Sequence, residues 1–383
     1  MVPNTCSRRK FVGTLGAAAG VWLARPALGW ASTTPTGRVA IGKCPEYGSQ
    51  VGDSLATLFD QLGGLNKLVN GKTVAIKLNL TGGPGRVAGL PAEMTYWVHP
   101  DVVAATVHLL GKAGAQRIRI LESPMATAEP LEQFMLRAKW DPHYFSSAAP
   151  RVEFENTNFL GQGKKYSRLS VPGGGLMFNA YDLNHSYEDC DVFVSVAKLK
   201  EHSTAGVTLS MKNCFGNTPC TIYGDGAGKD EPSLVPHGGR GMLHDGKRLP
   251  SKSAPPPLEA YESKDPGFRV PRVTADLVAA RPVHLAVIDG IHTMTAGEGP
   301  WTGHNKPVHP GVLVAGTNCV ATDAVSTALM GFDPMADRGT APFEKCDSTL
   351  KLAEQLGLGT RDLKRIDVIG TPIAQARMSF RAA

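Results

Sequence analysis

The segment Val192-Phe-Val-Ser-Val-Ala-Lys-Leu-Lys-Glu-His202 begins as an apolar run and passes directly into charged side chains. A valine-rich run without polar alternation predicts a strand that is covered on both faces. Similar runs occur at Arg38–Lys43, Thr73–Leu80, Arg117–Leu121, His284–Ile288, Gly311–Ala315 and Ile366–Ile369. Strands of this kind are typical of a parallel sheet buried between two layers of helices.

Helical patterns lie between several of these runs, at Asp53–Leu62, Pro100–Lys112, Thr322–Met330 and Ser348–Leu356. The alternation of strands and helices predicts an α/β fold with a mainly parallel sheet and helices on both faces. From about Phe215 to Pro271, glycine, proline, histidine and lysine replace the apolar periodicity. We therefore expect one α/β domain over residues 32–383 with a long irregular Gly/Pro-rich insert at about 215–271.

The N-terminal segment has the pattern of an export signal. Arg8 and Arg9 precede an apolar run rich in glycine and alanine, which ends in the small-residue exit Gly29-Trp30-Ala31. Paired arginines before such a run are typical of a cleavable twin-arginine signal peptide. A membrane anchor would need about 20 strongly apolar residues, and this run is weaker. We expect residues 1–31 to engage the twin-arginine translocase, leaving a periplasmic or secreted protein without a stable membrane span.

Removal of the signal lowers the net charge. The chain has 40 basic and 34 acidic residues, and residues 1–31 contain four of the basic ones and no acid. The remaining 36 basic and 34 acidic residues give a net charge of +2. So small an excess does not indicate nucleic-acid binding, and any functional basic character must be local.

Six cysteines remain after residue 31, without a C-x-x-C pair or a ferredoxin-like run. An iron–sulfur cluster is therefore not expected. An oxidising compartment permits disulfides, for which Cys214 and Cys220 are the closest pair. Buried free thiols are the alternative, above all for Cys190 and Cys319, which flank apolar strands.

Polar side chains follow the predicted strand at 73–80. Lys77 and Asn79 are two positions apart, so both point to one face of the strand, and a Gly-rich turn follows them. Ligands of open α/β sheets bind at the carboxyl ends of strands. The segment predicts an anion site, with a surface turn and an exposed lysine as the alternative.

A second and more informative group follows the strand at 192–196. Lys198, Lys200 and His202 come directly after it, and Lys212 and Asn213 lie a few positions further on. Clustered ammonium groups repel one another and lose hydration when buried, so they call for an acidic partner or a bound anion. Solvated lysines and a locally packed histidine are the alternative.

A third group contains two carboxylates. Asp289 closes the apolar run at 284–288, and Glu298 lies in a Gly-rich turn. Two carboxylates can hold a hard cation or act as acid and base. The alternative to such a functional role is that Asp289 only caps a turn. A further acidic residue, Asp323 after Thr322, is predicted to be a helix N-cap.

Common catalytic and nucleotide-binding motifs are absent from the sequence. It has no Walker A motif, no G-x-S-x-G, no H-E-x-x-H, and no G-x-G-x-x-G after a strand. Hydride transfer is therefore not supported, because the sequence has no motif for the cofactor that it needs.

Several short motifs occur in order along the chain. They are Lys77-x-Asn79 with its Gly/Pro loop, Val98-His99-Pro100, Lys198-x-Lys200-x-His202, Met211-Lys212-Asn213-x-Phe215-Gly216, Asp289-Gly290, Gly299-Pro300-x-x-Gly303 and Thr322-Asp323-Ala324-Val325. In combination, these segments resemble the DUF362 family, a domain of unknown function, over about residues 38–335. The resemblance implies a shared scaffold and pocket but no particular reaction, and the C-terminal ferredoxin module of some members has no counterpart here.

We expect the three groups to converge on one pocket for an anionic small molecule, with a carboxylate or phosphate group. Hydrolase or lyase chemistry, assisted by a divalent metal, is the favoured function. A non-catalytic periplasmic anion-binding protein and a maturation or interaction factor are the alternatives. The expected residues are His202, Lys200 and Asp289 for catalysis, Lys77, Asn79, Lys198, Lys212 and Asn213 for substrate binding, and Asp289 and Glu298 for metal binding.

Overall fold

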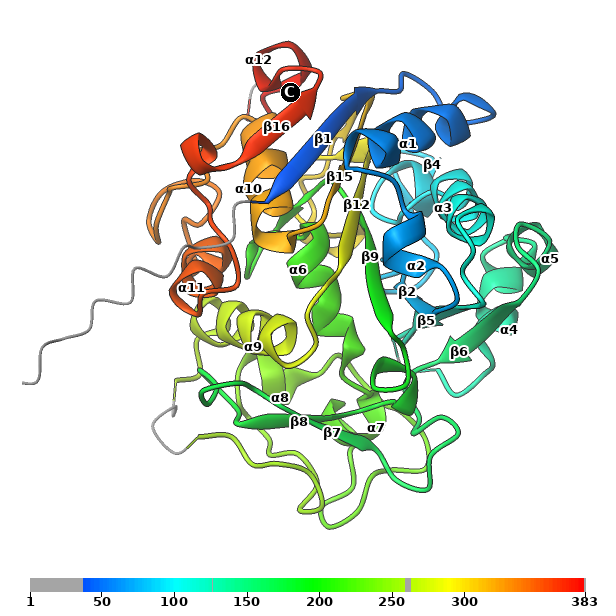
Figure 1. Cartoon of the computed structure of the whole chain (residues 1–383). Helices are drawn as coiled ribbons and strands as arrows, with labels where there is room; N and C mark the ends of the chain where they lie inside the picture. Colours follow the sequence, from blue (N-terminus) through cyan, green and yellow to red (C-terminus); the bar gives the residue numbers. More distant parts are fainter. Residues whose placement is uncertain (1–36, 126, 259–262, 382–383) are drawn as a thin grey trace, which may run out of the picture. The chain divides into compact units, whose positions relative to one another are not determined.

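The computed structural model describes residues 37–125, 127–258 and 263–381, so the predicted signal peptide lies outside the described residues. Its centre is an eight-stranded sheet (Figure 1). In spatial order the strands are β16 (Asp367–Gly370), β1 (Arg38–Lys43), β15 (Val312–Gly316), β12 (Leu285–Gly290), β9 (Val192–Lys198), β2 (Thr73–Lys77), β5 (Arg117–Glu122) and β6 (Val152–Asn156). Neighbouring strands are parallel except at β15, which pairs antiparallel with both β1 and β12. The predicted mainly parallel α/β fold is confirmed.

Side chains that alternate along the strands form two separate cores, one on each face of the sheet. In β9, Val192, Val194 and Val196 belong to one core, and Phe193 and Ala197 belong to the other. Both faces of the strand are buried, as the valine-rich run predicts, and each fully buried aliphatic side chain contributes roughly 1.5–3 kcal/mol.

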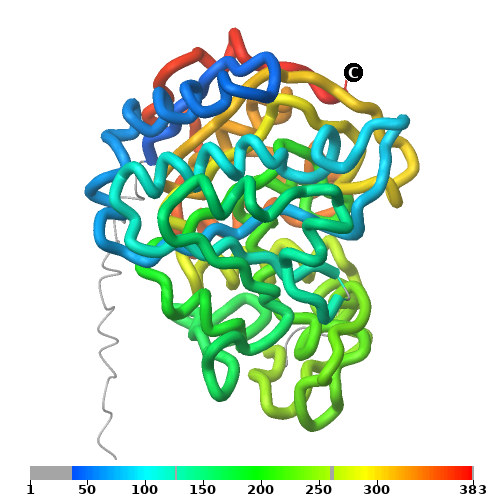
Figure 2. The backbone as a smooth tube through the Cα atoms, turned by 90° about the vertical axis from the view of Figure 1, so that its right-hand side faces the viewer, coloured from blue at the N-terminus to red at the C-terminus, as the bar shows by residue number. Residues whose placement is uncertain are grey.

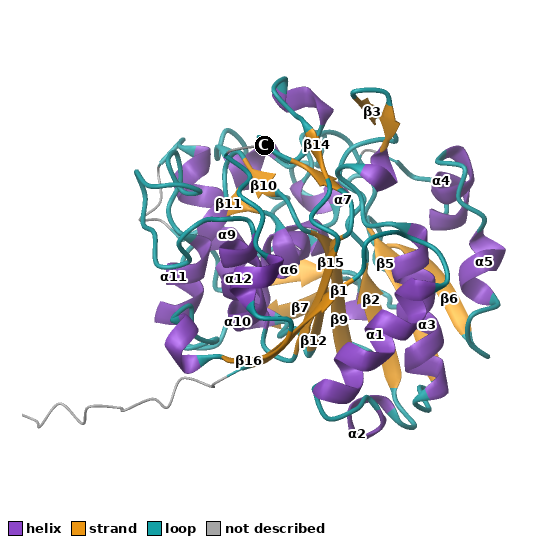
Figure 3. Cartoon of the chain, turned by 90° about the horizontal axis from the view of Figure 1, so that it is seen from above, coloured by secondary structure: helices purple, strands orange, loops and turns teal. Residues whose placement is uncertain are grey.

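Helices cover both faces of the sheet (Figure 3). The helices of one face are α1 (Gln50–Gln61), α2 (Asn66–Val69), α3 (Pro100–Lys112), α4 (Leu131–Arg137) and α5 (Pro142–Ser146). Those of the other face are α6 (Leu209–Asn213), α9 (Pro266–Ala280), α10 (Cys319–Leu329), α11 (Thr349–Gln355) and α12 (Ile373–Ala376).

Four two-stranded hairpins lie outside the main sheet. They are β3 (Arg86–Val87) with β4 (Leu90–Pro91), β7 (Ser167–Ser170) with β8 (Ala180–Leu183), β10 (Glu201–His202) with β11 (Gly206–Val207), and β13 (Thr293–Met294) with β14 (Pro307–Val308).

The structure corrects the predicted start of α10. The helix begins at Cys319, and its N-cap is Asn318, whose side chain accepts a hydrogen bond from the Ala321 amide at 2.9 Å. Asp323 is therefore not an N-cap. It lies inside the helix and is fully buried.

The insert is shorter and better packed than the sequence predicts. Its irregular part ends at Asp265, the N-cap of α9, because Pro266 is the first residue of that helix and Pro271 lies inside it. Two short helices, α7 (Cys220–Tyr223) and α8 (Gly241–His244), form within the insert. Figures 1 and 2 show it next to the β7–β8 hairpin, at one end of the sheet.

All six described cysteines are buried free thiols, including Cys214 and Cys220. The disulfide that an oxidising compartment would permit is therefore not formed in this structure. None of the helices in the described ranges has both the length and the apolar character needed to cross a bilayer.

Candidate functional site

A cavity of about 270 Å³ opens at the edge of the sheet where the parallel strands β2, β5 and β9 end. This edge is where open α/β sheets bind ligands. Seven of the nine side chains predicted from the sequence line the cavity. They are Lys77, Asn79, Lys200, His202, Lys212, Asn213 and Glu298.

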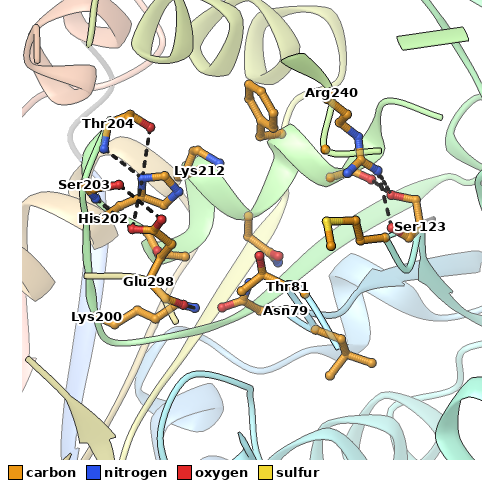
Figure 4. Close-up of a pocket in the computed structure, with 18 of the residues that line it drawn as sticks. Asn79, Thr81, Ser123, Lys200, His202, Ser203, Thr204, Lys212, Arg240 and Glu298 are labelled. Carbon is orange, nitrogen blue, oxygen red and sulfur yellow. Dashed lines mark hydrogen bonds and ion pairs between the residues drawn. The ribbon is translucent and has the colours of Figure 1, made fainter. Parts of the chain in front are cut away.

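The close-up shows how these side chains face one another (Figure 4). His202, Glu298 and Lys212 lie on one side, and Arg240 with Ser123 lies on the other. Asn79 and Thr81 lie between them.

Lys77 forms a buried ion pair at the base of the cavity. Its Nζ lies 2.6 Å from Glu122 Oε1, at the end of the neighbouring strand β5. The other Glu122 oxygen accepts a hydrogen bond from the Leu80 amide at 2.9 Å. Burial lowers the pKa of Lys77, and the Glu122 carboxylate opposes that shift. The charge of Lys77 is therefore balanced within the protein.

The two asparagines have different roles. Asn213 Nδ2 donates to Ser195 Oγ at 3.0 Å and to the Lys77 carbonyl at 3.2 Å, so it ties α6 to β9 and β2. Asn79 Oδ1 accepts a hydrogen bond from the Lys198 amide at 3.3 Å, and no partner for Asn79 Nδ2 is found among the described residues. Asn213 thus supports the cavity wall, whereas Asn79 Nδ2 is a donor available to a ligand.

Helix α6 is held by Asp323. One carboxylate oxygen accepts hydrogen bonds from Ser210 N at 2.9 Å and Ser210 Oγ at 2.5 Å, and the other accepts from Met211 N at 2.8 Å. Burial raises the pKa of Asp323 to about 7. Because Lys212 and Asn213 are on this short helix, Asp323 positions both.

Lys200 and Lys212 are the other two cavity lysines. Lys200 Nζ donates to the carbonyls of Tyr96 at 2.7 Å and Glu298 at 2.8 Å, and burial lowers its pKa well below the usual value. Lys212 Nζ lies 4.0 Å from the centre of the Phe215 ring, and in the described part of the chain no hydrogen-bond acceptor contacts it. Burial lowers the pKa of Lys212 to about 7.

Glu298 is fully engaged by protein donors. Ser203 N donates to Oε2 at 2.9 Å, and Ser203 Oγ and Trp301 Nε1 donate to Oε1 at 3.1 and 2.9 Å. Burial alone would raise the pKa of Glu298, but the nearby His202 imidazole and these hydrogen bonds lower it to about 2. Glu298 is therefore an ionised carboxylate that orients the loop of Ser203.

His202 is a neutral ring at neutral pH, because burial and then the charge of Lys212 lower its pKa well below the usual value. Its Nδ1 accepts a hydrogen bond from the Thr204 amide at 3.2 Å and lies 3.9 Å from Glu298 Oε2. A neutral imidazole whose Nδ1 accepts carries its proton on Nε2. His202 is thereby set up as a hydrogen-bond donor.

Arg240 and His244, both from the insert, also line the cavity. Arg240 Nε donates to the Thr218 carbonyl at 2.7 Å, and Nη2 contacts Ser123 Oγ. His244 Nδ1 lies 2.9 Å from the Arg240 carbonyl and must donate to it, so Nε2 is left as an acceptor. Burial lowers the pKa of His244 to about 4. His202 and His244 are thus neutral rings of opposite tautomer.

An indole lies at the rim of the cavity. Trp301 is about half exposed, at 52%, and packs against Gly82, where a Cβ atom would lie 2.6 Å from the ring. Gly82 has a φ of +69°, which also favours glycine. The indole can therefore report on occupancy of the cavity.

The structure does not bring Lys198 and Asp289 to the cavity. They form a separate, fully buried pair, with Lys198 Nζ 2.8 Å from Asp289 Oδ2. Tyr47 Oη donates to Asp289 Oδ1 at 2.9 Å, and the His99 amide donates to Oδ2 at 2.9 Å. Since these contacts occupy both carboxylate oxygens, the pair serves as a support between β9 and β12.

The family model of DUF362, a domain of unknown function, matches residues 74–328. This chain belongs to the DUF362 family.

A relative of this DUF362 chain is the "Thylakoid-associated protein sll1697" of Synechocystis, which is 27% identical over 308 residues. The match covers 80% of this chain and 74% of the relative.

Two solved structures are similar to the DUF362 chain at 13% identity. One is a protein from Thermotoga maritima, with a TM-score of 0.36 over 69% of this chain. The other is the lactate racemase apoprotein from Thermoanaerobacterium thermosaccharolyticum, with a TM-score of 0.35 over 71% of this chain. Each match spans about half, 54%, of the solved chain.

Every cavity residue named above lies inside the range that matches DUF362. Sequence reasoning missed Arg240 and His244, because the insert has no periodicity or motif that would single them out. Glu122 and Ser123 had a weak signal, since they end an apolar strand at the edge where ligands bind.

Proposed function

We propose that the cavity binds a small anionic molecule with a carboxylate or phosphate group, and that the protein is an enzyme acting on it. The observation behind this proposal is the excess of lysine and arginine over acidic side chains in the cavity. Three lysines and one arginine, Lys77, Lys200, Lys212 and Arg240, line it against two carboxylates. Both carboxylates, Glu122 and Glu298, already accept hydrogen bonds from the protein.

In this proposal Lys212 and Arg240 hold the anion. Lys212 is best suited because its ammonium group lies over the Phe215 ring and has no hydrogen-bond acceptor among the described residues, so a ligand oxygen would supply the missing acceptor. Arg240 would add a fixed charge on the opposite side of the cavity, and Asn79 Nδ2 a neutral donor.

The two neutral histidines provide the proposed chemistry. His244 can accept a proton on Nε2 as a general base, and the Nε2–H of neutral His202 can donate a hydrogen bond to an oxygen on which negative charge develops. Hydrolase or lyase chemistry is compatible with it. Assistance by a metal bound to Asp289 and Glu298 is not part of the proposal, because the two carboxylates are engaged at separate places.

Binding can be tested by isothermal titration of the mature chain with oxalate, acetate and inorganic phosphate, and by Trp301 fluorescence. We expect one site per chain, weakened at least tenfold in K212M and R240M. Lys247→Met is the matched control, because Lys247 is in the same insert but 77% exposed. Equal binding by K212M and K247M would contradict the proposal. Anion binding without turnover would favour the non-catalytic alternative.

We further propose that residues 1–31 direct export by the twin-arginine translocase to the periplasm or outside the cell. The paired Arg8 and Arg9 support this. Replacing both by lysine should leave the protein in the cytoplasm, as measured by cell fractionation and immunoblotting. Export of the R8K/R9K variant at the normal level would contradict the proposal.

A further inference from the structure

A second group of polar side chains, away from the cavity, lies at the same edge of the sheet. Glu46 follows β1, His292 follows β12, and His309 precedes β15. Because β15 runs antiparallel to its two neighbours, its beginning lies at the edge where β1 and β12 end. Three distant segments of the chain therefore meet here.

The three side chains lie close enough to share one ion. Glu46 Oε2 is 3.1 Å from His292 Nε2, and Glu46 Oε1 is 3.8 Å from His309 Nε2. One donor atom from each residue lies within 4.8 Å of the other two. The imidazole rings of His292 and His309 are stacked, with their centres 4.0 Å apart. Within the described ranges, this is the one such group of histidine, cysteine or carboxylate side chains.

Two imidazole nitrogens and one carboxylate oxygen are a ligand set that suits zinc. With zinc–nitrogen bonds of about 2.0–2.1 Å, tetrahedral ligand atoms lie roughly 3.4 Å apart, close to the separations found here. His309 Nε2 contacts the Pro45 carbonyl and must leave it to bind an ion. Glu46 and His309 are 62% and 41% exposed, so side-chain rotations can make this change and close the remaining gap. We propose that Glu46, His292 and His309 bind one Zn²⁺ ion, with a coordination position left for water or a ligand.

The surroundings give this site a supporting shell. The Tyr47 ring lies 5.6 Å from that of His292 and stacks on His99 at 3.6 Å between ring centres. Tyr47 Oη also donates to Asp289, which pairs with Lys198. Through Tyr47, the buried Lys198–Asp289 pair therefore holds the loop that contains Glu46.

Zinc titration tests the proposal. The mature chain, free of any affinity tag, is treated with a chelator, dialysed and titrated with Zn²⁺ by calorimetry. We expect one ion per chain and a higher melting temperature with zinc. E46Q and H309A, which alter exposed side chains and should fold normally, should each weaken binding at least about 100-fold, since even loss of an outer-shell partner costs 10–100-fold.

The matched control is His185→Ala. His185 also lies beside two carboxylates, but these face different ring nitrogens, with Nδ1 3.3 Å from Asp189 and Nε2 3.9 Å from Glu188. One donor atom from each of these three residues therefore does not meet the others within 4.8 Å, as it does at Glu46, His292 and His309. Zinc binding should be unchanged in H185A, and oxalate binding unchanged in E46Q. No stoichiometric zinc binding, or full binding by both E46Q and H309A, would overturn the inference. The site does not depend on the anion proposal, which the oxalate titration tests separately.

Discussion

In the proposed function, Lys212 makes anion binding depend on pH. Burial lowers the pKa of its ammonium group to about 7, so the side chain is mainly cationic at pH 6 and mainly neutral at pH 8. Anion affinity should therefore fall as the pH rises through 7, by about tenfold between pH 6 and pH 8 for one linked proton. Calorimetric titration with oxalate checks this, because oxalate is fully ionised at both pH values.

The variant K212M separates this effect from other titrations. Without the ammonium group, affinity should be roughly ten- to one-hundred-fold lower at pH 6, since hydrogen bonds to charged groups are worth about 1.5–3 kcal/mol. The pH dependence should also disappear. An unchanged pH profile in K212M would show that another group controls binding.

At the scale of single residues, the sequence predicts which side chains are unusual but not their partners. Lys198 is the last residue of β9 and Lys200 comes two positions later, yet Lys198 pairs with Asp289 whereas Lys200 lines the cavity. The difference comes from a neighbouring strand about 90 positions further on, which no local pattern reveals. Arg240 and His244 enter from an insert without periodicity.

Among the elements, helix α6 depends on a single buried carboxylate. Asp323 accepts all of its hydrogen bonds from Ser210 and Met211, in the first turn of the helix. Its replacement by alanine leaves those donors without partners, and we expect a loss of about 2–4 kcal/mol in the free energy of unfolding. Urea unfolding measures this loss of stability. The affinity for oxalate should fall as well, because α6 holds Lys212.

Asp333→Ala is the matched control for D323A. Asp333 is exposed and accepts a hydrogen bond from the Met335 amide in a turn. Removal of the Asp333 carboxylate should lower the free energy of unfolding by less than about 1 kcal/mol. Equal losses in the two variants would mean that Asp323 has no special role in docking α6.

The Lys198–Asp289 pair connects strands β9 and β12. K198M leaves a buried carboxylate without its counter-ion, and we expect a loss of about 3–5 kcal/mol in unfolding free energy. K252M, which breaks the exposed pair of Lys252 and Asp230, should cost less than about 1 kcal/mol. Oxalate affinity of K198M should stay within twofold of the native value. A loss of oxalate binding at full stability would instead restore the substrate-binding role that the sequence suggests for Lys198.

The elements themselves were largely predictable. Buried valine-rich runs and the Pro100 start identify most strands and α3, because both signals are local. Strand β6 was missed because it is a sheet edge with the charged, alternating sequence Val-Glu-Phe-Glu-Asn. The start of α9 was missed because Pro266 and Pro271 suggested breaks, whereas Pro266 opens the helix and Pro271 lies within it.

For the molecule as a whole, membership of the DUF362 family and the α/β architecture agree with what the sequence predicts. The convergence of three strand ends on one cavity follows from the parallel arrangement, since carboxyl ends of parallel strands meet at one edge. What the topology cannot supply is the reaction. In the proposed function the reaction depends on two histidine tautomers, which are set by the Thr204 amide and the Arg240 carbonyl.

Turnover is therefore the most direct test of the proposed function. The mature chain and its H202N, H244N and H185N variants are each incubated with a small-molecule extract of the native cell, and anionic compounds are followed by mass spectrometry. We predict that the native chain and H185N deplete one small anion, and that H202N and H244N do so about 10²–10⁴-fold more slowly. Depletion at equal rates by all four proteins, or of no anion at all, would contradict the account.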